Sequence, residues 1–202
     1  ATVSADTETV AVRIGFRTVA VDGDVITVNG EKIIFRGVNR HEWHPRTGRT
    51  LDEKTMRTDL ELMKRHGVNA IRTSHYPPNA RFLDLCDEYG VWVLLECDLE
   101  THGFEWGGWD GSPTGDRRWY DCLLNRIQRT VERDKNHPAI IGWSMGNESH
   151  CGEGIRLMND WVKERDPSRF THYEGDYAHA IVDVWTVMYP SMASTHSMDG
   201  YI

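Results

Sequence analysis

The chain is poor in several features that would place it in a special class of protein. Its 202 residues include only four cysteines, and none of them forms the CxxC pair of a zinc knuckle. Four cysteines in a domain of this size do not make a disulfide framework, so we expect reduced thiols and a cytoplasmic location. No apolar run approaches the ~20 residues of a membrane span, and no basic start with an apolar block indicates a signal peptide.

Positive charge and nucleotide-binding motifs are also scarce. The 23 Lys+Arg residues are outnumbered by 31 Asp+Glu residues, and the formal net charge of −8 disfavours nucleic acid and anionic membranes as partners. No GxGxxG motif follows the first predicted strand, which argues against a dinucleotide-binding sheet. Aromatic groups, by contrast, are plentiful: eight Trp, seven Tyr and ten His residues offer rings that can stack on sugars, although most Trp residues in proteins lie in cores or interfaces.

From residue 31 onwards, apolar runs alternate with helical patterns. Strands are predicted at 33–38, 69–73, 91–96, around 140, 170–173 and 182–188, and helices at 51–67, 77–89, 117–136 and 154–165. This alternation indicates a parallel sheet, and polar groups at the strand ends favour a (β/α)8 TIM barrel. A barrel closes with eight strands, and only about six are present. We therefore expect an incomplete barrel and part of a longer chain, because six open strands would expose two edges.

The first thirty residues follow a different pattern. Residues 9–21 alternate apolar and polar side chains, as in a strand with one wet face, and residues 25–28 follow as a second strand. Asn29-Gly30 is a strong hairpin turn signal. We interpret 1–30 as the last strand of an immunoglobulin-like β-sandwich domain plus a hairpin, and 31–202 as the N-terminal part of the barrel.

Several predicted strands end in side chains that carry chemistry. These are His41 and Glu42, Arg72 and His75, Glu96 and Glu100, Asn147 and Glu148, and Tyr189. A lone His in a loop is more often structural than functional, but in a barrel all these strand ends meet at one mouth. A Glu placed there beside an amide, as in Asn147-Glu148, suits glycoside hydrolysis, which needs a carboxyl group as proton donor.

Glu100 and His102 are separated by one residue on an extended segment, so their side chains point the same way. With Glu148 nearby they would provide two carboxylates and an imidazole, a donor set that suits Mg²⁺ or Mn²⁺ with water at the other positions. The spacing alone does not favour a metal site over a chance pair, because ExH pairs are common.

Five runs of residues point together to one family. They are 36–42, 72–77, 100–103, 133–138 and 143–149, and residues 12–17 precede them like the last strand of a sandwich domain. In this order the runs resemble the large bacterial β-galactosidases of glycoside hydrolase family 2. The resemblance implies a (β/α)8 barrel, retaining hydrolysis of terminal β-D-galactosides of the lactose type, and a homo-oligomer when the chain is full length.

The resemblance also implies a role for each site residue. Glu148 would be the general acid/base, and Glu100, His102 and Glu148 would hold Mg²⁺, with Na⁺ as a further ion of the full-length enzyme. The residues implied in substrate binding are His41, His75, Asn147, Tyr189 and Arg72. β-Glucuronidases of the family share the Asn-Glu pair but resemble this chain less at 100–103, which favours a galactosidase.

The second carboxylate of the reaction is missing from the pattern. A retaining hydrolase needs a nucleophile ~5 Å from its acid/base. In the family it follows on the seventh strand, whereas this chain ends at Ile202 after the sixth predicted strand. We interpret Asp176 and Glu174 as loop residues and expect the nucleophile beyond the C-terminus. The alternative is a catalytically incompetent fragment that binds sugar or metal.

Overall fold

The centre of the molecule is a parallel sheet whose strands follow the order of the sequence. It is seen in a computed structural model that describes residues 2–5, 7–11 and 13–190. The sheet contains β6 (Gly37–Arg40), β7 (Ala70–Thr73), β8 (Trp92–Glu96), β9 (Ile140–Ser144) and β10 (Phe170–His172). Their spatial order is β10-β9-β8-β7-β6, so each strand pairs with the next one along the chain. That order is typical of a barrel wall, whereas a doubly wound sheet reverses direction at its middle.

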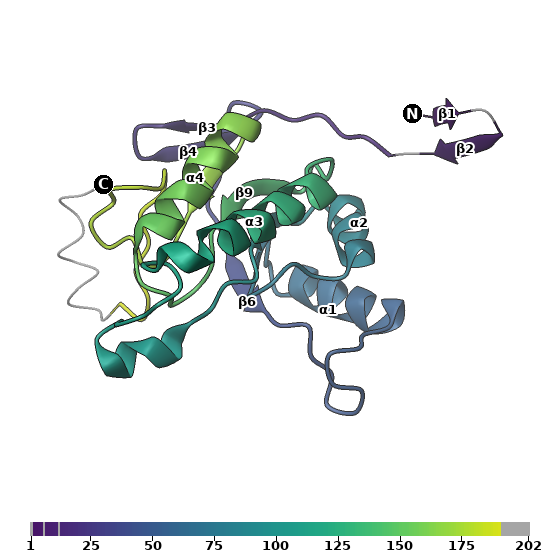
Figure 1. Cartoon of the computed structure of the whole chain (residues 1–202). Helices are drawn as coiled ribbons and strands as arrows, with labels where there is room; N and C mark the ends of the chain where they lie inside the picture. Colours follow the sequence, from purple (N-terminus) through teal and green to yellow (C-terminus); the bar gives the residue numbers. More distant parts are fainter. Residues whose placement is uncertain (1, 6, 12, 191–202) are drawn as a thin grey trace.

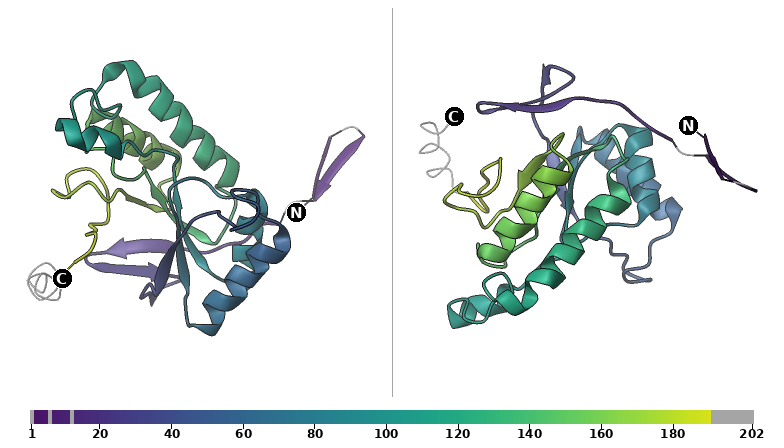
Figure 2. Two further views of the ribbon diagram at one scale, coloured as in Figure 1. Left: turned by 90° about the horizontal axis from the view of Figure 1, so that it is seen from below. Right: turned by 45° about the horizontal axis from the view of Figure 1, so that its top comes forward.

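Four helices cover one side of this sheet (Figures 1 and 2). They are α1 (Glu53–Arg65), α2 (Ala80–Tyr89), α3 (Tyr120–Asp134) and α4 (Glu153–Arg165). The sequence predicted all four, and local signals fix their ends. Asp52 and Asn79 accept hydrogen bonds from backbone N–H groups at the starts of α1 and α2, and Gly90 ends α2 in the left-handed region at φ 64°. The predicted start of α3 is instead a short 3₁₀ turn, η2 (Arg117–Trp119).

The main core lies between the sheet and the helices. On β8, Val93 and Leu95 are buried against this core, while the alternate residues Trp92 and Leu94 face a second cluster. This period of two is the geometry of a strand. The second cluster is centred on Val28, Ile141 and Phe170, so the hairpin of β3 (Val19–Asp22) and β4 (Val25–Val28) packs against the sheet.

The N-terminal segment differs from the single long strand predicted at 9–21. It contains β1 (Thr2–Ala5), β2 (Glu8–Ala11), β3 (Val19–Asp22), β4 (Val25–Val28) and β5 (Glu31–Lys32). The β1–β2 hairpin stands apart from the rest of the chain (Figure 1). Residues 13–18 belong to no strand, and the Arg17 side chain donates to the carbonyl oxygens of Pro138 and Ile140. The assignment of residues 1–30 to a sandwich domain stays a prediction.

Two predicted barrel strands need correction. The first one was expected at 33–38, but β6 spans Gly37–Arg40, because residue 33 still bonds to the β4 backbone at Ile26. The sixth one, at 182–188, is not a strand, and only Val184 forms an isolated parallel bridge, to His172. The Asp183 carboxylate accepts from the N–H and hydroxyl of Thr171, so a side chain supplies bonds that a ladder would otherwise make. The described sheet therefore has five barrel strands rather than six.

In the part of the chain that the structure describes, no helix is both long enough and apolar enough to cross a bilayer.

Candidate active site

The predicted site residues come together at the carboxyl ends of the strands. His41 follows β6, and Asn147 and Glu148 follow β9. Arg72 lies in the last part of β7, and His75 follows that strand. Tyr189 is the exception: it is 93% exposed near the end of the described chain, and no hydrogen bond or ring contact joins it to the others. The common end of a parallel sheet thus gathers the set, as expected of a barrel mouth.

Asn147 is held rigidly at the centre of this group. A Cβ on Gly146, whose φ is 152°, would lie 2.7 Å from the carbonyl oxygen of Leu99. Glycine therefore permits the close approach in which the Asn147 N–H donates to that oxygen at 2.8 Å. The Asn147 side chain is 1% exposed, and its Oδ1 accepts from Arg72 Nη2 at 2.8 Å. Its Nδ2 consequently faces the carboxylates of Glu100 and Glu148, at 3.2 and 3.0 Å.

Glu148 has a backbone conformation that side chains with a Cβ rarely adopt, with φ 30°. Two neighbours hold it there. The Glu148 N–H donates to Glu174 Oε1 at 2.6 Å, and the next N–H, of Ser149, donates to the Tyr173 hydroxyl at 3.0 Å. Such conformations cluster at functional sites, where the surroundings fix them.

The Glu174 carboxylate was not predicted as part of this site. It is 2% exposed, and burial raises its pKa above the usual range of a carboxyl group. Its Oε2 is buried and has no hydrogen-bond partner among the residues that the structure describes. The available sequence signal was its place directly after a short buried strand, which indicates a strand-end carboxylate without revealing its contact with Glu148.

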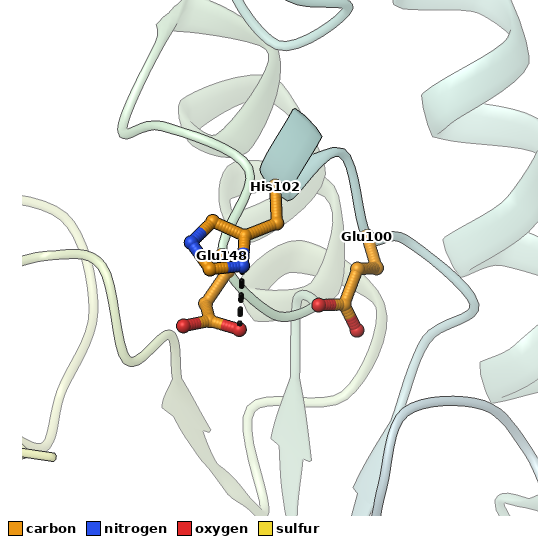
Figure 3. A group of neighbouring side chains, drawn as sticks. All are labelled: Glu100, His102 and Glu148. Carbon is orange, nitrogen blue, oxygen red and sulfur yellow. Dashed lines mark ion pairs between the residues drawn. The ribbon is translucent and has the colours of Figure 1, made fainter. Parts of the chain in front are cut away.

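Glu100, His102 and Glu148 form a group that could hold a metal ion (Figure 3). One donor atom from each lies within 4.8 Å of the other two. Octahedral ligands at ~2.1 Å from Mg²⁺ lie about 3 Å apart in adjacent positions and about 4.2 Å in opposite positions, so a small closure would complete the arrangement. The residues therefore fit the predicted ion.

His102 is also oriented as a metal ligand requires. Its Nε2 lies 2.7 Å from Glu105 Oε2, and its Nδ1 lies 3.4 Å from Glu148 Oε2. Because a carboxylate accepts at Nε2, Nδ1 is the atom left to bind a cation, the pattern common among metal-binding histidines. Glu105, then Glu148 and Glu100, raise the pKa of His102 above its ordinary value. Glu105, in η1 (His102–Gly107), is a second residue that sequence reasoning missed.

The His41 and His75 rings contact each other at the mouth, edge-on, with their centroids 5.3 Å apart. Burial, and then the neighbouring His75, lowers the pKa of His41. His75 Nδ1 lies 2.6 Å from Glu96 Oε1. The two imidazoles therefore lie edge-on to each other at the carboxyl ends of β6 and β7, and the His75 ring is joined to β8 through Glu96.

A cavity of about 510 Å³ opens beside Glu148. Trp109 and Tyr177 line it, together with His150, whose ring stacks on that of Trp109 at 5.7 Å between centroids. Flat rings next to a carboxylate can contact the faces of sugars. These residues lie in loops whose sequence carries no periodic signal, and they too were missed.

Asp176, which the sequence analysis interprets as a loop residue, is bound by backbone donors. Its carboxylate accepts from the backbone N–H groups of Ala180, Ile181 and Val182. Burial alone would raise the pKa of Asp176, but these three donors outweigh burial and lower it. The carboxylate shapes a loop, in line with its interpretation as a loop residue.

Comparison with known proteins places the chain among glycoside hydrolases with a barrel. Residues 19–201 match the family of glycosyl hydrolases family 2, TIM barrel domain. A β-galactosidase from Arthrobacter sp. (strain B7) is 58% identical over 176 residues, which are 87% of this chain and 17% of that protein. A β-galactosidase from Vibrio cholerae is 47% identical over 178 residues, again 87% and 17%. The chain belongs to glycosyl hydrolase family 2, and it spans about a sixth of the length of these curated relatives.

Solved structures of the family share the fold. The β-glucuronidase of Parabacteroides merdae has a TM-score of 0.78 at 26% identity, covering 94% of this chain and 25% of its own. The β-galacturonidase of Eisenbergiella tayi, bound to galacturonate, has a TM-score of 0.76 at 26% identity, covering 94% and 36%. The five parallel strands are thus part of a (β/α)8 barrel, which confirms the predicted fold class.

Proposed function

We propose that this chain carries the acid/base side of a retaining glycosidase site, and that the full-length protein hydrolyses terminal β-D-galactosides. The observation that carries the proposal is the strand-end pair Asn147-Glu148, in contact with Glu100 and His102 at the mouth of a family 2 barrel. A carboxyl group held there can reach a glycosidic oxygen in the mouth.

In the proposed reaction the Glu148 carboxyl donates its proton to the leaving-group oxygen as the glycosidic bond breaks. A nucleophilic carboxylate takes the sugar carbon and forms a glycosyl-enzyme. Glu148, now a carboxylate, removes a proton from the water that attacks this intermediate, and the free sugar leaves. Asn147 Nδ2 would bond the sugar 2-OH, and His41 and His75 would bond other hydroxyls, with His75 acting in the transition state.

We assign the nucleophile to a segment outside the described residues. Two carboxylates near Glu148 are already engaged. Glu174 Oε1 accepts the N–H of Glu148, and the residue is only 2% exposed. Asp176 is bonded to three backbone N–H groups. The implied role of Tyr189 in substrate binding stays a prediction.

Glu100, His102 and Glu148 would hold a Mg²⁺ ion. When bound, the ion supplies a positive charge beside the carboxylate that donates and accepts the proton. Asn147 Nδ2 already bridges the two carboxylates, and Glu105 orients the imidazole. The proposed Na⁺ ion, the homo-oligomer and the cytoplasmic location stay predictions.

The sugar is proposed from the curated relatives. Curated relatives that are 41–58% identical to this chain are named β-galactosidases. The solved β-glucuronidases and β-galacturonidases resemble this chain at about half that identity. Glucuronide hydrolysis is the second candidate, because these structures share the fold closely.

The test is hydrolysis of 2-nitrophenyl β-D-galactoside and of the matching β-D-glucuronide by the full-length protein. We expect the galactoside to be preferred, with activity reduced by a chelator and restored by Mg²⁺. Preference for the glucuronide would select the second candidate, and no hydrolysis of either would overturn the proposal. Turnover by the isolated 202-residue chain at the full-length rate would contradict the outside placement of the nucleophile.

A further inference from the structure

Glu96, the last residue of β8, is a charged group in an unexpected place. Its side chain is fully buried, at 0% exposure, at the end of a strand whose other side chains are apolar. Burying a carboxylate costs several kcal/mol unless hydrogen bonds and charges compensate for the lost water. The contacts of Glu96 show what it does with that position.

Three side chains donate to the Glu96 carboxylate at the same short distance. Arg72 Nε and Ser144 Oγ both lie 2.6 Å from Oε2, and His75 Nδ1 lies 2.6 Å from Oε1. The Glu96 N–H in turn donates to Thr73 Oγ1 at 2.9 Å. The carboxylate thus ties β8 to the ends of both neighbouring strands, β7 and β9.

The first consequence concerns His75. An ionised carboxylate only accepts hydrogen bonds, so the proton of the ring lies on Nδ1. Nε2 is therefore the nitrogen that remains for a ligand in the mouth. Without Glu96 the His75 ring could flip, so that Nδ1 and Nε2 change places. Among the described residues, no other hydrogen bond holds Nδ1 in its position.

The second consequence passes through Arg72 to Asn147. With Nε fixed on Glu96, the planar guanidinium directs Nη2 to Asn147 Oδ1 at 2.8 Å. This contact decides which way the Asn147 amide is turned, because a guanidinium cannot accept a hydrogen bond. Nδ2 is then directed at Glu148. One buried carboxylate thereby orients both the imidazole and the amide of the site.

We propose that Glu96 is a positioning residue for glycoside hydrolysis. Its carboxylate fixes which nitrogen of His75 faces the sugar. Through Arg72 it also fixes which side of the Asn147 amide faces the sugar. The inference rests on the proposed function, because it assigns a use to these two groups. A buried ion pair is a poor device for stability alone, since apolar side chains of similar volume often serve as well.

The test compares Glu96→Gln with the unmutated full-length protein on 2-nitrophenyl β-D-galactoside. Gln keeps the shape, but its amide cannot accept from Arg72, Ser144 and His75 together. We expect kcat to fall roughly 10- to 100-fold, as for other residues that orient site groups, with KM changed far less. We also expect a smaller loss on the 2-deoxygalactoside, because that substrate lacks the hydroxyl assigned to Asn147.

A double-mutant cycle separates positioning from a general structural effect. If Glu96 acts through His75, Glu96→Gln combined with His75→Ala should lose much less than the product of the single losses. Losses that multiply, together with equal losses on the 2-deoxygalactoside, would overturn the proposal. So would a Glu96→Gln protein with unchanged kcat.

Asp166→Asn is the matched control. Asp166 is also a buried carboxylate with an arginine partner, Arg169, and it accepts from Trp143 Nε1, but it precedes β10 at the opposite end of the sheet. We expect Asp166→Asn to lower the unfolding temperature and to leave kcat and KM unchanged.

If Glu96→Gln shows no cooperative unfolding, Glu96→Asp replaces it. Asp keeps the charge but withdraws the carboxylate by one methylene from His75 and Arg72, so kcat should still fall. Full activity of a folded Glu96→Asp protein would overturn the positioning role. If the unmutated protein hydrolyses no β-glycoside, the proposed function itself is wrong. That outcome is distinct from a failure of the positioning role of Glu96, in which the unmutated protein is active.

Discussion

His102 shows how a single residue is prepared for a role by a neighbour close in sequence. Its Nε2 lies 2.7 Å from the Glu105 carboxylate, which leaves Nδ1 directed towards Glu148. The same arrangement raises the pKa of His102 through Glu105, Glu148 and Glu100. A cation in this place would replace the proton as the partner of the imidazole, since a histidine must be neutral at the binding nitrogen.

At the residue scale we therefore expect Glu105→Ala to weaken Mg²⁺ binding by about tenfold, the lower end of the effect seen when the partner of a metal-binding histidine is removed. Isothermal titration of the metal-free full-length protein with MgCl₂ measures this. Glu105→Gln keeps an acceptor for Nε2 and should lose less. Glu164→Ala, an exposed site on α4, is the control. Equal Mg²⁺ affinities in all four proteins would contradict the role of Glu105 in orienting His102 for the metal.

The residues that could be predicted from the sequence are those whose position on a strand is itself the signal. Asn147 and Glu148 follow a fully buried strand, and that is enough to place them at the mouth. The roles of Glu96 and Glu174 depend on contacts with residues 21 to 48 positions away in the chain. No local pattern contains such contacts, which is why these carboxylates were named as strand-end or loop residues without a function.

Neighbouring strands are fitted to each other as closely as the site residues are. On β9, a Cβ added to Gly142 would lie 2.4 Å from the ring of Phe170 on β10. The two residues are register partners, so the ring lies over the glycine. This close fit brings β9 and β10 together below Glu148 and Glu174.

At the element scale we expect Gly142→Ala to destabilise the protein by about 1–3 kcal/mol, because the Phe170 ring must leave its place in a packed cluster. Urea unfolding of the barrel, followed by tryptophan fluorescence, measures the change. Gly107→Ala is the control, since a Cβ there meets nothing within 4 Å. Equal stability of the two variants would show that the ring is not held as described.

Elements with strong local signals were predicted well, and those that depend on distant partners were not. The caps at Asp52, Asn79 and Gly90 mark α1 and α2 almost to the residue. The predicted strand at 182–188 has an apolar pattern, but it meets β10 over two residues only. The N–H groups of Asp183 and Val184 donate to the Thr171 carbonyl oxygen, and Val184 forms an isolated bridge with His172. An apolar run alone does not show whether a neighbouring strand is aligned with it.

For the molecule as a whole, the order of the five parallel strands and the match over residues 19–201 define the barrel of a family 2 glycoside hydrolase. Half of the proposed chemistry lies on the described residues. The buried Glu96 carboxylate accepts from Arg72, and the buried Glu174 carboxylate accepts from the Glu148 N–H. Glu148 itself belongs to the group that could hold a metal ion. The nucleophile is proposed to come from elsewhere in the full-length protein.

The most direct test of the role of Glu148 is how activity in the Glu148→Gln protein depends on the leaving group. A general acid matters most when the departing oxygen is basic. The full-length variant should therefore lose about 10²- to 10⁴-fold in kcat/KM on lactose or a methyl galactoside, and far less on 2,4-dinitrophenyl β-D-galactoside, which leaves without a proton. Equal losses on all these substrates, or full activity on lactose, would contradict the assignment of Glu148 as the acid/base.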